Sequence, residues 1–318
     1  MIIKLLYKQV YSAQDISNII DIIFVGSLGF CIDESLTSQT LSEVDNGNMN
    51  IIGLEKYGIA HLQEIAYVGN GVFGLEISKD SQLNIKEGRA LTLDIPFAPI
   101  VTVSSNQENV EEFLTVDYFN GLVIRKQCFD EFHVKYQYFA HRNYPSVFVQ
   151  EIQIRNLKHK LVDLSLVLPR VVGIWESSTS QNIKIQKDTK MIDHQVVSGR
   201  VELPGINKVR VVSVVFRNLP RILTLHKSGV HNFRILMTIN YSKQITKEAF
   251  ESTKEVVEKF AIDAMKKVLE EHEVESSGDD AFFLFRVQHT KVWNSLWQTG
   301  FYISPSKAEN ALNGKIKP

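Results

Sequence analysis

The chain has little cysteine: Cys31 and Cys128 are the only two in 318 residues. Two cysteines are too few for a disulfide framework, and they lack the paired spacing of a zinc site. An excess of one charge is also missing, since 35 basic and 36 acidic residues leave a net charge of -1. This balance excludes the basic field that attracts nucleic acid, so we expect no nucleic-acid partner.

Long apolar runs are missing as well. The run from Ile19 to Ile32 is interrupted by Asp21 and is too short to span a bilayer. Two lysines precede it and Ser27-Leu28-Gly29 has cleavage-like spacing, so one interpretation of residues 1–34 is a hydrophobic leader or the remnant of an anchor. A buried strand or helix of the fold is the alternative, and the sequence leaves both open.

What the chain does contain is 44% hydrophobic residues, enough for a sizeable core. Apolar and polar residues alternate almost everywhere between Ile51 and Tyr241, for example over 132–138 and 162–168. A period of two is typical of half-buried strands, and turn pairs such as Asn120-Gly121 join them. With roughly a dozen or more strands and no helix among them, the pattern predicts a mainly β fold, a large antiparallel supersandwich.

Two helices are expected to follow the strands. At Thr246, a candidate N-cap, the apolar period changes to three and four residues, and a second helical stretch begins near Asp280 and ends before Gly300. The apolar face of the first helix is predicted to carry Phe250, Val257, Phe260, Ala264 and Val268. That of the second carries Phe282, Phe285, His289, Trp293 and Leu296.

These patterns divide the chain into five parts. The predicted parts are a leader or anchor remnant (1–34), a polar linker (35–50), the β-supersandwich (51–242), an α-helical linker (243–303) and a truncated tail (304–318).

The stretch from Gly69 to Gly74 spells the dinucleotide fingerprint G-x-G-x-x-G. That fingerprint binds a pyrophosphate only where its glycines open a helix. Here Phe73, Leu75 and Ile77 alternate with polar residues, which predicts a β-hairpin. We therefore interpret the glycines as turn and packing residues and expect no cofactor.

Paired carboxylates are a further candidate, because glycoside cleavage uses a carboxylic acid and a base. Glu131, Glu151 and Glu176 lie on or beside predicted strands, where solvent-facing residues are the commoner interpretation. The acidic cluster at 270–275 is interpreted as a solvated helix end, and no metal site is expected. The sequence therefore identifies no catalytic residue.

Polar and aromatic residues at turns and on the second helix give the remaining candidates. His141-Arg142, at the end of a strand, could bind an anion or fix the turn through loop carbonyls, and the second interpretation is preferred. His289, Trp293 and Trp297 share a helical face, where packing on the sheet is favoured over sugar stacking. Trp175 is a candidate sugar contact, and Asn240-Tyr241-Ser242 is a glycosylation acceptor if the chain enters the secretory pathway.

Three segments in order resemble a known enzyme family. They are "GNGVFGLEISKDSQLNI", "YFAHRNYPSVFVQEIQIRNL" and "HTKVWNSLWQTGFYI", and from 62 to 303 the chain looks like the N-terminal half of the disaccharide phosphorylases and acid trehalases of glycoside hydrolase family 65. The resemblance implies a supersandwich and a helical linker that leads into an (α/α)6 barrel. The positions that match the shared motifs are Asn70, Gly71, Gly74, His141, Arg142, Pro145, His289, Trp293 and Trp297.

A closer resemblance is to an animal family of uncharacterised single-pass membrane proteins that keep this sandwich and linker. It implies a secretory-pathway glycoprotein with an N-terminal leader and a C-terminal membrane anchor. In the enzymes the catalytic residues lie in the barrel, so none of the matching positions corresponds to a catalytic residue.

The expectation is therefore a non-catalytic structural or interaction ectodomain with a carbohydrate or protein partner. One alternative is the N-terminal half of an inverting α-glucoside phosphorylase or hydrolase, and another is a sugar-binding module that uses exposed aromatics such as Trp175.

Overall fold

The computed structural model describes residues 49–55, 66–78, 81–104, 110–118, 120–187, 190–271 and 279–297. The predicted leader, most of the polar linker and the predicted tail lie outside these residues. The strands are β1 (Met49–Glu55), β2 (Tyr67–Gly69), β3 (Phe73–Glu76), β4 (Leu83–Glu87), β5 (Ala90–Ile95), β6 (Phe97–Ala98), β7 (Thr102–Ser104), β8 (Glu111–Asp117), β9 (Leu122–Cys128), β10 (Phe132–Ala140), β11 (Val147–Asn156), β12 (Val162–Val167), β13 (Arg170–Val171), β14 (Thr179–Lys187), β15 (Lys190–Glu202), β16 (Val209–Arg217), β17 (Ile222–Leu225) and β18 (Val230–Tyr241). A 3-10 turn (Lys247–Ala249) and the helices α4 (Phe250–Glu271) and α5 (Asp279–Trp297) follow.

One large sheet organises the chain. It has nine antiparallel strands in the order β1-β8-β9-β10-β11-β18-β16-β15-β14. Side chains alternate between its two faces: Val134, Tyr136 and Tyr138 of β10 join one buried cluster, whereas Phe139 joins another. Both faces are therefore apolar and both must be covered.

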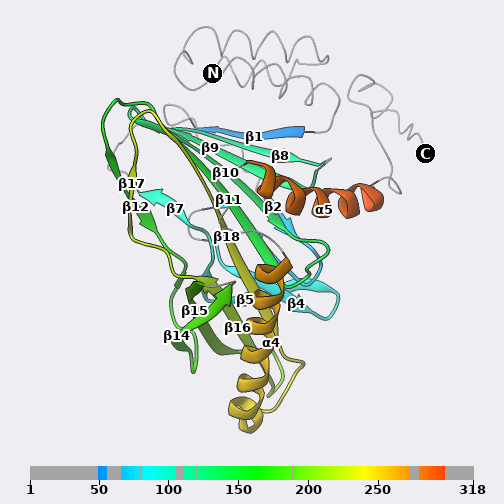
Figure 1. Ribbon diagram of the computed structural model, residues 1–318. Helices are drawn as coiled ribbons and strands as arrows, with labels where there is room; N and C mark the ends of the chain where they lie inside the picture. Colours follow the sequence, from blue (N-terminus) through cyan, green and yellow to red (C-terminus); the bar gives the residue numbers. More distant parts are fainter. Residues whose placement is uncertain are drawn as a thin grey trace, which may run out of the picture.

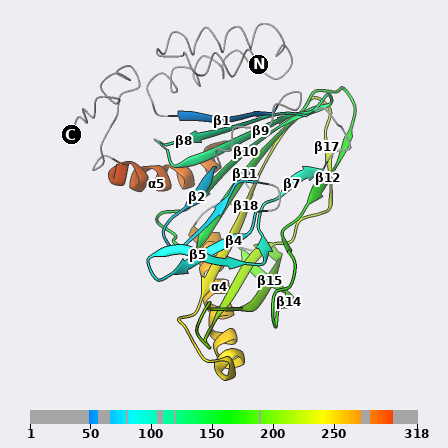
Figure 2. The same ribbon diagram turned by 180° about the vertical axis from the view of Figure 1, so that it is seen from behind.

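Three smaller sheets cover the inner face. They have the strand orders β17-β12-β7, β13-β6 and β2-β3-β4-β5. Figure 2 shows β4, β5 and β7 in front of the large sheet. Two side chains of the large sheet bind the chain that faces it. The Gln150 carboxamide accepts from Val101 N–H at 3.0 Å and donates to Val101 C=O at 2.6 Å, and Tyr136 Oη accepts from Val103 N–H at 3.0 Å. These bonds satisfy buried polar groups between the two layers.

The two helices cover the outer face, as Figure 1 shows. α4 packs on β16 and β18 through Ala261, Met265 and Val268, and Thr238 Oγ1 donates to the carbonyl of Ala261 at 2.8 Å. The predicted mainly β fold of antiparallel sheets followed by helices is confirmed. Within the described residues, neither helix combines the length and the apolar character that crossing a bilayer requires.

The buried face of α4 differs from the prediction in one respect. Phe260 is 59% exposed, because the stripe that meets the sheet runs through Val257, Ala261, Met265 and Val268. Residue 260 is offset by about 100° from residue 261 around the helix, so it points outward. The predicted cap also differs: Thr246 precedes the 3-10 turn, and its side chain makes no capping hydrogen bond.

Candidate functional site

The glycine-rich stretch forms the turn between β2 and β3. Gly71 has φ +86°, a left-handed conformation that glycine adopts without strain. β3 continues into β4, so the glycines open a hairpin, as predicted, and not a helix. A pyrophosphate would meet no helix N-terminus here.

The side chain of Asn70 joins this turn to the one between β10 and β11. Its Oδ1 accepts from Val72 N–H at 3.0 Å and from Phe73 N–H at 3.3 Å. Its Nδ2 donates to the carbonyls of His141 at 3.3 Å and Pro145 at 2.8 Å. Asparagine suits this position because one planar amide supplies two donors and an acceptor.

His141 connects the same turn to α5. Its Nδ1 accepts from Asn143 N–H at 3.1 Å and Tyr144 N–H at 3.3 Å, so the ring proton lies on Nε2. Nε2–H then donates to the carbonyl of Phe285 at 3.1 Å, and the two rings lie 4.3 Å apart between centroids. The neutral ring is fully buried and makes all three bonds in this one tautomer.

The turn between β8 and β9 holds the C-terminal half of α5. Trp293 Nε1 donates to the carbonyl of Tyr118 at 2.7 Å, and His289 Nε2 donates to the carbonyl of Gly121 at 3.2 Å. Gly121 has φ +69°, and a Cβ added to it would lie 2.5 Å from Trp293 Cδ2. The indole ring therefore occupies space that a glycine leaves open.

Arg142 lies over the indole of Trp293. Its Cζ is 4.7 Å from the ring centroid, and Nη1 donates to the carbonyl of Asn70 at 3.3 Å. Burial lowers the pKa of Arg142, because a charged guanidinium loses hydration there. The cation–π contact compensates for part of this loss. We call Asn70, Gly121, His141, Arg142, Phe285, His289 and Trp293 the helix seat.

The helix seat contains most of the sequence-predicted motif positions. Asn70, His141, Arg142, His289 and Trp293 meet there, and the Pro145 carbonyl accepts from Asn70. Gly71 and Gly74 belong to the hairpin that carries Asn70. Trp297 is the last residue of α5, and its side chain lies outside what the structure describes.

The sequence does not indicate one member of the helix seat and one group beside it. Gly121 was recognised only as a turn residue, although the pair Asn120-Gly121 was the available signal. A buried ion pair beside the seat was missed as well: Arg234 Nη2 lies 2.6 Å from Glu151 Oε1, and Arg286 of α5 lies 3.5 Å from the same carboxylate.

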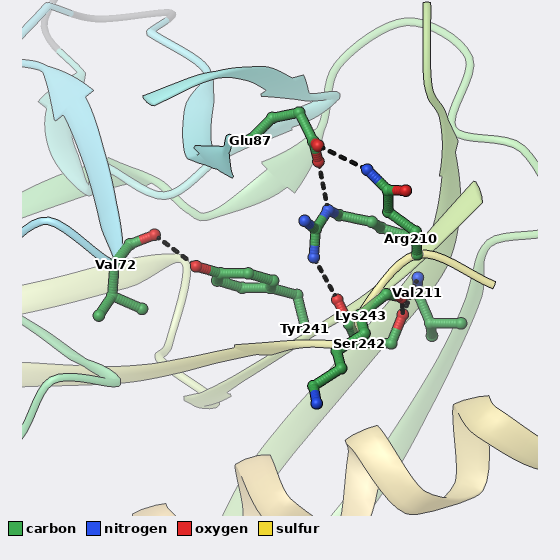
Figure 3. A network of polar contacts seen from close by, with 8 residues as sticks. Val72, Glu87, Arg210, Val211, Tyr241, Ser242 and Lys243 are labelled. Atoms are coloured by element: carbon green, nitrogen blue, oxygen red, sulfur yellow. Dashed lines mark hydrogen bonds and ion pairs between the residues drawn. The ribbon is translucent and has the colours of Figure 1, made fainter. Parts of the chain in front are cut away.

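A second polar network joins the β2–β5 sheet to the strand that leads toward α4 (Figure 3). Arg210 donates to Glu87 at 2.5 Å and to the carbonyl of Ser242 at 2.6 Å, and it lowers the pKa of Glu87. Tyr241 Oη donates to the carbonyl of Val72 at 3.0 Å, next to the turn that holds Asn70. This network fixes the hairpin from its other side.

The remaining candidates lie elsewhere. Trp175 is only 4% exposed and packs against Phe97 and Gly199, so it is not the exposed ring that sugar stacking requires, and that interpretation is corrected. Asn240 is half-buried on β18, and its Oδ1 accepts from Tyr241 N–H at 2.8 Å.

The contact between Gly121 and Trp293 can be tested with a matched pair of variants. Gly88 also has a left-handed φ, +61°, but nothing lies within 4 Å of an added Cβ. Gly88→Ala should therefore cost about 1–2 kcal/mol of backbone strain. Gly121→Ala should cost about 1–3 kcal/mol more, because the indole must move. Chemical denaturation measures both, and equal losses would contradict the contact.

Burial of His289 predicts a pH dependence. Burial lowers the pKa of His289 from 6.5 to about 4, and in the described part of the chain Nδ1 has no hydrogen-bond partner. The unfolded chain therefore takes up a proton that the folded chain refuses. The contribution of the neutral His289 to the free energy of unfolding is therefore fully present above pH 6.5. It falls by about 2–3 kcal/mol as the pH falls toward 4.

Denaturation between pH 7 and pH 4 checks this dependence against His289→Gln, which keeps a donor for the Gly121 carbonyl. The variant should lose less stability on acidification than the parent chain. Other histidines with lowered pKa values, such as His133 and His194, contribute equally to the pH dependence of both proteins, so their effect cancels in the difference between the two. Parallel curves for the two proteins would show that His289 does not titrate as expected.

Comparisons with known proteins place the chain in a family. No curated protein matches it. Among solved structures, "Putative kojibiose phosphorylase from human microbiome" is 11% identical with a TM-score of 0.45, and the match covers 73% of this chain and 35% of that one. The chain thus spans about a third of that protein. A family model described as "Uncharacterized conserved protein (DUF2152)" matches residues 4–316, and the chain belongs to this family.

Proposed function

We propose that the chain is a non-catalytic interaction domain of a secretory-pathway protein, and that the complete protein is anchored in a membrane by a single span. The observation that carries the non-catalytic role is the use of the motif side chains. His141 and Trp293 bond main-chain groups across the contact between α5 and the sheet, and Asn70 bonds the main chain of the turn that carries His141. Their chemistry is engaged in positioning a helix.

The acidic residues considered for glycoside chemistry are engaged as well. Glu151 pairs with Arg234 at 2.6 Å, Glu176 with Arg200 at 2.8 Å, and Glu131 with Lys160 at 3.2 Å. A general acid must reach and protonate a leaving oxygen, whereas each of these carboxylates is engaged in an ion pair. These pairings support a role other than catalysis.

The secretory location has support from Cys128. This residue, at the end of β9, is disulfide-bonded. Disulfides persist in oxidising compartments, which include the secretory pathway, and are rare in the cytosol. Cys31, the other cysteine of the sequence, lies outside the described residues, and we propose it as the partner of Cys128.

Expression in animal cells tests the location. Endoglycosidase treatment should lower the mass of the chain by one glycan, and Asn240→Gln should abolish that shift, since Asn240 begins the one sequon of the chain. Non-reducing peptide mass spectrometry should recover Cys128 linked to Cys31. Ser242 is a poorer position to change, because its hydroxyl accepts from Val211 N–H. An unmodified chain in the cytosolic fraction would refute the location.

A turnover assay tests the non-catalytic role. The purified chain, incubated with α-linked glucose disaccharides with and without phosphate, should release neither glucose nor glucose 1-phosphate. The matched control is Glu151→Gln, which removes the charge of the most buried carboxylate discussed above. Turnover by the parent chain that the variant lacks would contradict the proposal.

A further inference from the structure

A cavity of about 540 Å³ opens at the end of the sandwich away from the helix seat. It lies between the inner face of β15 and β16 and the chain from β12 to β13. Its volume falls in the range of small-molecule pockets. Its lining includes Phe97, Leu166, Val197, Phe216 and Leu219 together with three arginines.

Most of this lining is apolar. Phe97 and Phe216 lie at its base, nearly fully buried, with ring centroids 5.7 Å apart. Leu166 and Val197 belong to the same core cluster, and Leu219 packs against it. An apolar body placed in the cavity would therefore be removed from water against the existing core.

The charged side chains of the lining all carry one sign. Arg170 lies on β13, Arg217 ends β16 and Arg221 precedes β17, and no Asp or Glu lines the cavity. Arginine presents a planar set of N–H donors that matches the two oxygens of a carboxylate. The three arginines come from three separate segments and gather at one cavity, which the net charge of -1 does not reveal.

We infer that this cavity binds an amphipathic organic anion, in which an apolar body carries one carboxylate or similar oxyanion. The body lies on Phe97, Phe216 and Leu166, and the oxyanion faces the arginines. Gln195 and Asn218 also line the cavity, and their amide groups donate to Ser180 Oγ at 2.6 Å and to Asn182 Oδ1 at 3.3 Å. The ligand is bound and released unchanged. This inference goes beyond the interaction role proposed above and does not depend on the cellular location.

Fluorescence of 8-anilinonaphthalene-1-sulfonate, itself an amphipathic anion, measures the site directly. The folded chain should bind the dye in a saturable manner, and decanoate should displace it. Decan-1-ol has the same chain length but no charge and should compete at least about tenfold more weakly, since one charge-assisted contact is worth about a factor of ten or more. Equal competition by the two would overturn the requirement for an anion.

A matched pair of charge reversals locates the dye. Arg221 and Lys208 are both exposed, but only Arg221 lines the cavity, and each change to Glu alters the net charge equally. Arg221→Glu should weaken decanoate binding about tenfold or more, and Lys208→Glu by less than about twofold. Near-ultraviolet circular dichroism should confirm that both variants remain folded. Equal effects of the two substitutions would show that the dye binds elsewhere. Displacement of the dye by glucuronate but not by decanoate would refute the inference that the ligand has an apolar body.

Discussion

The structure depends on one constraint: a nine-stranded sheet with two apolar faces must be covered on both. Antiparallel sheets commonly leave one face to solvent, but this one has buried clusters on each side. Three small sheets cover the inner face, and α4 and α5 cover the outer one (Figures 1 and 2). The helical segment is therefore part of the core of the domain and not an appendage to it.

The sequence predicted the local elements well because periodicity is a local property. The alternation between 51 and 241 identified the strands, and the glycines after Tyr67 were correctly interpreted as a hairpin. Its failures concern orientation. The apolar period of α4 is compatible with Phe260 on the buried face. Ala261 is buried and Phe260 exposed because of where the sheet lies, which periodicity does not predict. The sequence predicts an exposed Trp175, but its ring is buried in the core, where it packs against Gly199 because that residue has no side chain.

The helix seat lay beyond sequence-based prediction for a related reason. Its members come from positions as distant as Asn70, His141 and Trp293, and no periodicity relates them. The order of their motifs along the chain supports a resemblance to a family, but it does not predict that these side chains are in contact. The cavity illustrates the same limit: its arginines stand on three separate segments, and a whole-chain charge near zero conceals them.

Three of the hydrogen bonds that hold α5 end on main-chain carbonyls, those of Tyr118, Gly121 and Phe285, whereas Arg286 of α5 contacts the side chains of Gln137 and Glu151. Every residue has a carbonyl, so these three hydrogen bonds depend on the path of the backbone and not on most of the side chains along it. Substitutions in the turn after β8 can therefore accumulate without loosening the helix as long as the turn keeps its shape. Gly121 is an exception, because there the shape itself requires the absence of a side chain, and Asp117 is another, because its carboxylate accepts from Asn120 and fixes the turn.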